Sequence, residues 1–275
     1  MIRDITLGQY YDADSVIHRL DPRVKIVAAF VYLVMIFFVR DFIGYLFVGA
    51  VLAAVIIASG VPLRFIARGM RPIMFILLFT FLINIFMYRG AVLVRLGPLS
   101  ITDNGLKQAV FIALRLVLLI FGTSLLTYTT KPMALTDGIE SLLRPLRRIG
   151  VPAHEIAMMM SIALRFIPTL LEETDKIMKA QQARGADFES GNLFQRAKSL
   201  IPLLIPLFVN AFRIAMDLAM AMEARCYRGG EGRTRLHPMK YRRSDAAAYV
   251  LLILFAVLVI VQSRGLLPIP MLWEV

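Results

Sequence analysis

Five apolar stretches in this chain approach the length that a helix needs to cross a lipid bilayer, which is about 20 residues with a range of about 17–25. They are Val24–Val39, Phe42–Ser59, Ile73–Tyr88, Ala109–Tyr128 and Ala246–Ser263. Of the 275 residues, 59% are hydrophobic and 18% are charged, whereas a soluble domain has about 45–50% and about 25%. Because a soluble core cannot bury so much apolar surface, we expect an all-α, polytopic membrane protein with about five transmembrane helices.

The distribution of lysine and arginine predicts the orientation, because cytoplasmic loops of membrane proteins carry an excess of these residues. Segments 1–25, 60–72 and 129–245 hold 25 of the 31, and the loops expected on the other side hold five. We therefore expect a multi-pass protein of the cell membrane with a cytoplasmic N-terminus, a cytoplasmic 129–245 segment and an external C-terminus. Sidedness also accounts for the net charge of +12, so no nucleic-acid partner is expected.

The segment between the fourth and fifth apolar stretches is too long for a simple connector. We expect it to form a region of cytoplasmic or interfacial coupling helices (129–245), between a four-helix membrane domain (1–128) and a final transmembrane helix with the external C-terminus (246–275). Its predicted helical pieces are 137–148, 154–184 and 200–225. Thr136 or Asp137 is expected to cap the first piece, and Pro145 to bend or break it. The basic and apolar faces of this piece are typical of a helix in the membrane interface.

The two longer pieces finish on matching tripeptides, Ala183-Arg184-Gly185 and Ala224-Arg225-Cys226, with the arginines 41 residues apart. Gly185 is a helix-stop signal, and Gly229 with Gly230 is expected to end the second piece. An arginine at a helix C-terminus stabilises the helix by about 0.3–1 kcal/mol, so each arginine could serve as a cap and nothing more. Two matched ends on two half-apolar helices instead favour a pair of docking sites for a two-lobed partner.

An ordered set of motifs resembles the transmembrane component, or T component, of energy-coupling factor transporters over nearly the whole chain. The motifs are Leu7–Tyr10, Ser15–Arg23 with Lys25, Ile162–Thr169, Gln182–Ala186 and Glu223–Arg235. The resemblance implies that Ala183, Arg184 and Gly185 form one ATPase-docking site, and Ala224, Arg225 and Cys226 the other, with each arginine in a groove of one ATPase. Cys226 stands where the family has glycine or another small residue, which puts the turn after Arg225 in question.

The same resemblance implies a transmembrane scaffold subunit of an ATP-driven importer, with no catalytic residues of its own. Its expected partners are two ABC ATPase subunits, alike or different, one substrate-binding membrane S component and the lipid bilayer. The cargo would be a vitamin or a metal ion, with ATP and magnesium bound by the ATPases and no cofactor on this chain. In agreement, the sequence has no P-loop motif. The alternative is a self-sufficient secondary transporter or channel, although the predicted spans carry no acidic residue and no matched pair of broken helices.

Few other residues suggest chemistry. Cys226 is the only cysteine, which excludes an intrachain disulfide and a cysteine-cluster metal site, and no metal site is expected. Asp21 and Pro22 predict a helix start, followed by Arg23 and Lys25 as anchors at the inner membrane surface. Arg115 lies inside the fourth span, where a charge suggests function. Snorkelling or contact with a backbone carbonyl, Asn84, a lipid phosphate or a partner subunit is expected for it.

Overall fold

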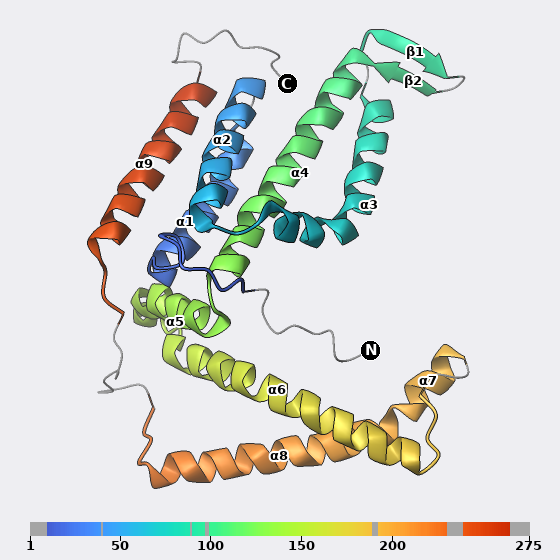
Figure 1. The fold of residues 1–275 in the computed structure, drawn as a ribbon, viewed down its shortest axis with the longest axis vertical. Coiled ribbons are helices and arrows are strands. Elements are labelled where there is room, and N and C mark those ends of the chain that lie inside the picture. Colours follow the sequence, from blue (N-terminus) through green and yellow to red (C-terminus); the bar gives the residue numbers. More distant parts are fainter. Residues whose placement is uncertain are drawn as a thin grey trace. The chain divides into compact units, whose positions relative to one another are not determined.

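The computed structural model describes residues 10–39, 41–88, 90–96, 99–188, 192–229 and 239–264. They are almost entirely helical (Figure 1). Parts of two motifs, 7–9 and 230–235, and the expected external C-terminus from residue 265 onward lie outside the described residues. The chain divides into two compact units, which we treat separately. The first holds the described residues from 10 to 139 and from 239 to 264, and the second holds those from 140 to 229.

The first unit is built from five long helices and one hairpin. Their bounds are α1 Pro22–Phe38, α2 Phe42–Ser59, α3 Leu63–Met87, β1 Val92–Leu96, β2 Leu99–Thr102, α4 Asp103–Thr129 and α9 Arg243–Ser263. Helix α4 packs against α1, α2 and α3, while α9, the last helix described, packs against α1. The antiparallel hairpin links α3 to α4 and was not predicted; Val94 pairs with Ile101 and Leu96 with Leu99.

Local capping fixes where several of these helices begin and end. The predicted start of α1 is confirmed, because Asp21 Oδ1 accepts a hydrogen bond from the Arg23 N–H at 2.9 Å and Pro22 occupies the first helical position. Helix α2 ends at Gly60, which has a positive φ of 69°. Helix α4 begins after Thr102, whose hydroxyl accepts a hydrogen bond from the Gly105 N–H.

The buried residues of the first unit form two apolar clusters at the contacts between helices. One includes Ile36, Val48 and Phe255, and the other Ile66 and Tyr128. The outward faces are apolar as well, and the most exposed large side chains include Ile57, Phe75, Met87 and Leu251. Broad apolar exposure of this kind is a liability in water and suits a protein surrounded by lipid.

Five of the described helices are long and apolar enough to cross a membrane, namely α2, α4, α6, α8 and α9. The number agrees with the prediction, but the membership differs. Helix α1 has 17 residues, and the apolar part of α3, Ile73–Met87, is also short. Helices α6 and α8 qualify because their first halves are strongly apolar. Their assignment to the cytoplasmic or interfacial region stays a prediction, as do the domain boundaries.

The second unit contains a pair of long antiparallel helices, α6 and α8 (Figure 1). Its elements are the 3₁₀ helix η2 Arg144–Ile149, α6 Ala153–Ala183, α7 Leu193–Ser199 and α8 Ile201–Ala224. Gln181 Nε2 near the end of α6 donates to the Pro202 carbonyl at the start of α8 at 3.4 Å. At the other end of the pair, the Tyr227 hydroxyl after α8 lies 3.5 Å from His154 Nε2 at the start of α6.

One predicted helix start is wrong, and two other predicted boundaries are confirmed. Helix α5, Pro132–Leu143, begins before the predicted capping residues, and the Thr136 hydroxyl donates to the Met133 carbonyl within the helix. Helix α8, Ile201–Ala224, agrees with the predicted piece 200–225, although the turn that ends it lies at Cys226 and not at Gly229-Gly230. The break expected at Pro145 is confirmed, because α5 gives way to the 3₁₀ helix one residue earlier.

Candidate functional site

The end of α6 carries the first predicted arginine in a Schellman motif, a hydrogen-bonded helix end that needs one residue with positive φ. The Gly185 N–H donates to the Gln182 carbonyl at 2.9 Å, and the Ala186 N–H donates to the Gln181 carbonyl at 3.0 Å. Gly185 has φ 85°. Arg184 is the last residue before this turn and is exposed together with Ala183 and Gly185. The backbone therefore fixes the position from which the Arg184 side chain projects.

The end of α8 repeats this arrangement bond for bond. The Cys226 N–H donates to the Glu223 carbonyl at 2.8 Å, and the Tyr227 N–H donates to the Met222 carbonyl at 3.0 Å. Cys226 takes the left-handed conformation with φ 56°. Ala224, Arg225 and Cys226 are all exposed. The turn that the cysteine put in question is thus kept.

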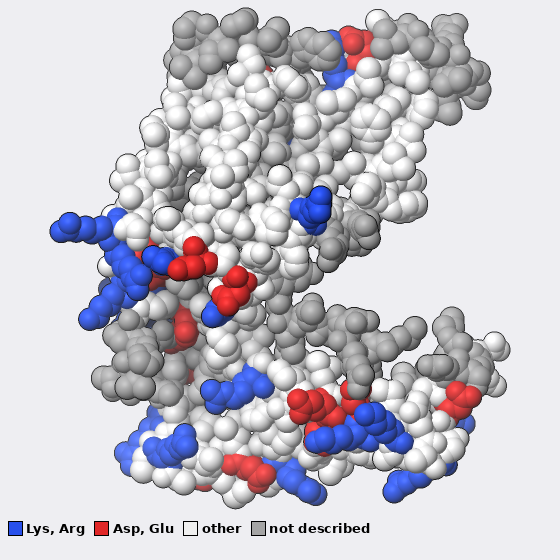
Figure 2. All heavy atoms as spheres, viewed as in Figure 1, with Lys and Arg blue, Asp and Glu red and all other residues white. Residues whose placement is uncertain are grey.

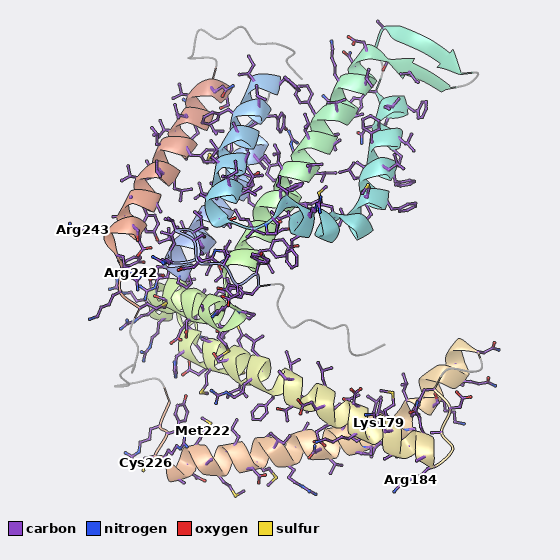
Figure 3. The ribbon with its side chains drawn as sticks, viewed as in Figure 1. Lys179, Arg184, Met222, Cys226, Arg242 and Arg243 are labelled. Carbon is purple, nitrogen blue, oxygen red and sulfur yellow. The ribbon has the colours of Figure 1, made fainter. Side chains whose placement is uncertain are left out.

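The two arginines lie at opposite ends of the antiparallel pair. Figure 3 places Arg184 at one end and Cys226, the neighbour of Arg225, at the other. Helix α8 has 24 residues, and this length corresponds to about 36 Å at the usual rise of an α-helix. Sequence reasoning found both tripeptides, but it did not show that the helices run in opposite directions. One partner with a single small binding surface therefore cannot hold both arginines.

Charged side chains are distributed differently over the two units. In the view of Figure 2, they are spread along α6 and α8, whereas in the first unit they gather near the start of α9, where Arg242 and Arg243 lie, and the rest of the long helices presents mainly uncharged atoms. Neither Arg184 nor Arg225 forms an ion pair with any of the residues described. A guanidinium offers five donors and can hold a carboxylate through two parallel hydrogen bonds. Each helix end can therefore bind an acidic or carbonyl-lined groove.

The strained turn at Cys226 gives a testable expectation. The left-handed conformation costs a non-glycine residue about 1–2 kcal/mol, and glycine avoids this cost. Glycine, however, makes the unfolded chain more flexible, which lowers the free energy of unfolding by about 0.5–1 kcal/mol. Cys226→Gly is therefore expected to raise the free energy of unfolding by about 0.5–1 kcal/mol, and Gly185→Cys to lower it. Thermal unfolding of the two variants measures both changes. Equal destabilisation by both substitutions would contradict the shared turn geometry.

A side-chain cluster that the sequence did not reveal lies beside the Arg225 end. His154 Nδ1 is 3.1 Å from Glu140 Oε1, and its other ring nitrogen faces the Tyr227 hydroxyl. The cluster connects the start of α6 to the turn after α8. His154 and Tyr227 are 73 residues apart, and no local pattern signals such a contact.

Arg115 lies in the first unit and contacts a residue that was not among its expected partners. Its Nε donates to the Tyr45 hydroxyl of α2 at 2.9 Å, and the guanidinium lies 5.6 Å from the centre of the Phe37 ring. Asn84, one expected partner, donates instead to the Thr80 carbonyl of its own helix. The expected contact of Arg115 with lipid or with a partner subunit stays a prediction.

Comparison with known proteins identifies the family. A family model described as "Cobalt transport protein" matches residues 13–236. A protein of Thermosediminibacter oceani named "Energy-coupling factor transporter transmembrane protein EcfT" is 60% identical over 256 residues, which cover 93% of this chain and 97% of that protein. Proteins with the same name from Ruminiclostridium cellulolyticum and Bacillus subtilis are 55% and 47% identical, covering 96% and 94% of this chain and 98% of each relative.

These matches extend across both units and both arginine-capped helix ends. The resemblance seen in the motifs is confirmed, and it fits the helical, apolar fold of the described residues. The chain belongs to the family of transmembrane components of energy-coupling factor transporters, whose members serve as non-catalytic subunits.

Proposed function

We propose that this chain is the scaffold of an ATP-driven importer and couples two separate ATPase subunits to a separate substrate-binding membrane protein. In this proposal, ATP and magnesium bind to the ATPases, and the membrane partner captures a vitamin or a metal ion. The chain itself would bind no cofactor and perform no chemical step. Its N-terminus and the α6–α8 unit would face the cytoplasm, where the ATPases are.

One observation carries the proposal: two exposed arginines cap opposite ends of an antiparallel helix pair with the same backbone turn. A charge-assisted hydrogen bond from arginine contributes about 1.5–3 kcal/mol when shielded from water. Each ATPase would close over one arginine. The rigid helix behind that arginine would then transmit movement of the ATPase to the rest of the chain.

A stripe on α8 supports contact with a membrane partner. Ile205, Phe208, Phe212, Met216 and Met220 recur at helical spacing, and their exposed fractions lie between 59% and 67%. A continuous apolar face of this kind is typical of an interaction surface, and methionines adapt to differently shaped partners. We propose that this stripe contacts the substrate-binding membrane protein.

The proposal is tested by purifying the tagged chain from cells that also produce the partner subunits. We expect two ATPase subunits and one small hydrophobic membrane protein to purify with it. In liposomes, uptake of the cargo should require ATP and all partners. If the purified chain alone moved cargo down an ion gradient, the secondary-transporter alternative would be correct and the scaffold proposal wrong.

A further inference from the structure

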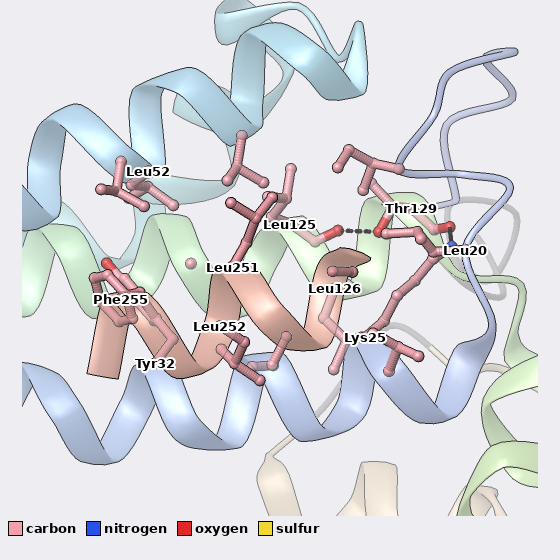
Figure 4. Close-up of a pocket in the computed structure, with 18 residues that line it drawn as sticks. Leu20, Lys25, Tyr32, Leu52, Leu125, Leu126, Thr129, Leu251, Leu252 and Phe255 are labelled. Atoms are coloured by element: carbon pink, nitrogen blue, oxygen red, sulfur yellow. Dashed lines mark hydrogen bonds between the residues drawn. The ribbon is translucent and has the colours of Figure 1, made fainter. Parts of the chain in front are cut away.

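The first unit contains an apolar cavity of about 260 Å³ between α1, α2, α4 and α9 (Figure 4). Its walls include Leu52, Leu125, Leu252 and Phe255. For comparison, an engineered apolar cavity of about 150 Å³ in another protein holds a benzene molecule. On α1 the lining residues extend from Val24 to Tyr32, which corresponds to about 12 Å along the helix axis. The space therefore suits a long, narrow apolar group.

The polar side chains on the cavity wall are bonded within the protein, with one partial exception. The Tyr32 hydroxyl donates to the Leu118 carbonyl at 2.9 Å, and the Thr129 hydroxyl donates to the Leu125 carbonyl at 2.8 Å. The exception is Lys25. Its ammonium donates to the His18 and Thr129 carbonyls at 3.0 and 2.8 Å, and an ammonium has three N–H donors.

Lys25 is therefore a buried charge whose direct partners, within the described part of the chain, are neutral. It is 8% exposed, and no described carboxylate lies within ion-pair distance of it. Two carboxylates, Asp21 and Asp245, attract the Lys25 ammonium through space but do not contact it. They accept hydrogen bonds from backbone N–H groups instead. A buried ammonium is unfavourable unless its donors are bonded and its charge is balanced, so an anion that accepts the remaining N–H at this end of the cavity would stabilise it.

We propose that the cavity binds one acyl chain of an anionic lipid, with the lipid carboxylate or phosphate at Lys25. The apolar walls match the acyl chain, and the remaining N–H donor of the Lys25 ammonium matches the anionic head. The outward faces of this unit are apolar and suited to lipid, so lipids are the molecules present around it. The proposal does not depend on the transporter function.

The test measures lipids bound to the full-length chain in detergent by native mass spectrometry. The lipids added are oleate, palmitoyl-oleoyl phosphatidylglycerol, which is anionic, and the matching phosphatidylcholine, which is zwitterionic. We expect one anionic lipid to bind per chain, and Lys25→Met to weaken its binding about tenfold, as loss of one charge-assisted hydrogen bond implies. Lys25→Arg should retain binding. Binding of oleate alone would identify a fatty acid, and binding of the phosphatidylglycerol alone a phospholipid.

Two matched substitutions on α9 test whether the lipid binds in the cavity, and they do so even if a Lys25 variant fails to fold. Ala248 lines the cavity, whereas its neighbour Ala247 is exposed. Ala248→Phe should fill the cavity and abolish the one-to-one binding, while Ala247→Phe should bind as the unchanged chain does. Equal lipid binding by these two variants, or equal affinity for phosphatidylcholine and phosphatidylglycerol in the unchanged chain, would overturn the proposal.

Discussion

Replacing both Arg184 and Arg225 with alanine is expected to abolish ATP-driven uptake. Each substitution would remove one proposed charge-assisted contact worth about 1.5–3 kcal/mol, so docking of an ATPase at that helix end should weaken about ten- to a hundredfold. The two ends lie at opposite ends of the helix pair, so their losses should be independent and add. The measurements are the amount of ATPase that purifies with the tagged chain and cargo uptake by the whole complex in liposomes.

Two controls make this result specific. Arg213→Ala removes an exposed arginine from the middle of α8 and should leave docking almost unchanged. Arg184→Lys and Arg225→Lys retain the charge but lose the forked geometry, so each should give an intermediate loss. If the double alanine variant took up cargo as fast as the unchanged chain, the docking role of the two arginines would be refuted.

Asp245→Ala is expected to cause the largest loss of stability among the predicted variants. Asp245 is 1% exposed, and its two carboxylate oxygens accept hydrogen bonds from the Asp21 N–H at 2.9 Å and the Arg242 N–H at 2.6 Å. Alanine would leave both donors, at the starts of α1 and α9, without these partners. A buried donor that loses its partner costs about 1–3 kcal/mol, so the loss of both partners should lower the free energy of unfolding by about 2–6 kcal/mol.

Thermal unfolding of the detergent-solubilised chain measures this loss. Asp245→Asn keeps one acceptor oxygen and should lose about half as much. Asp14→Ala is the control for the loss of an aspartate that is not buried. Within the described part of the chain, Asp14 forms an exposed ion pair with Arg19, and exposed pairs contribute little. A melting temperature of Asp245→Ala equal to that of Asp14→Ala would show that the buried carboxylate does not hold the two helices.

The features predicted well from the sequence are those set by a few neighbouring residues. The start of α1 follows from Asp21 and Pro22, and the end of α6 follows from Gly185. Pro145 ends the α-helical geometry of its segment. The start of α5 was mispredicted because Pro132 provides an equally good first helical residue, and the Thr136 hydroxyl bonds inside the helix instead of capping it.

The features that escaped prediction depend on residues far apart in the chain. Asp245 binds the backbone at Asp21, 224 positions away, and no periodicity or motif connects them. The same is true of the contact between Arg115 and Tyr45, and of the Lys25 ammonium at the Thr129 carbonyl. Arg184 and Arg225, which we propose dock the ATPases, were selected from their tripeptides, but their separation to opposite ends depends on how α6 and α8 pair.

The antiparallel pairing of α6 and α8 has a consequence for the symmetry of the assembly. A half-turn about an axis between two antiparallel helices exchanges one with the other, and here it also exchanges one arginine-bearing turn with its counterpart. Two ATPases related by a twofold axis, the commonest symmetry of protein pairs, would each meet an arginine in the same backbone setting. The equivalence is incomplete, because α6 has 31 residues and α8 has 24. The residues after the arginines also differ: Cys226, which carries a thiol, follows Arg225, and Gly185, which has no side chain, follows Arg184. Two different ATPases would therefore have a chemical basis for binding in one orientation.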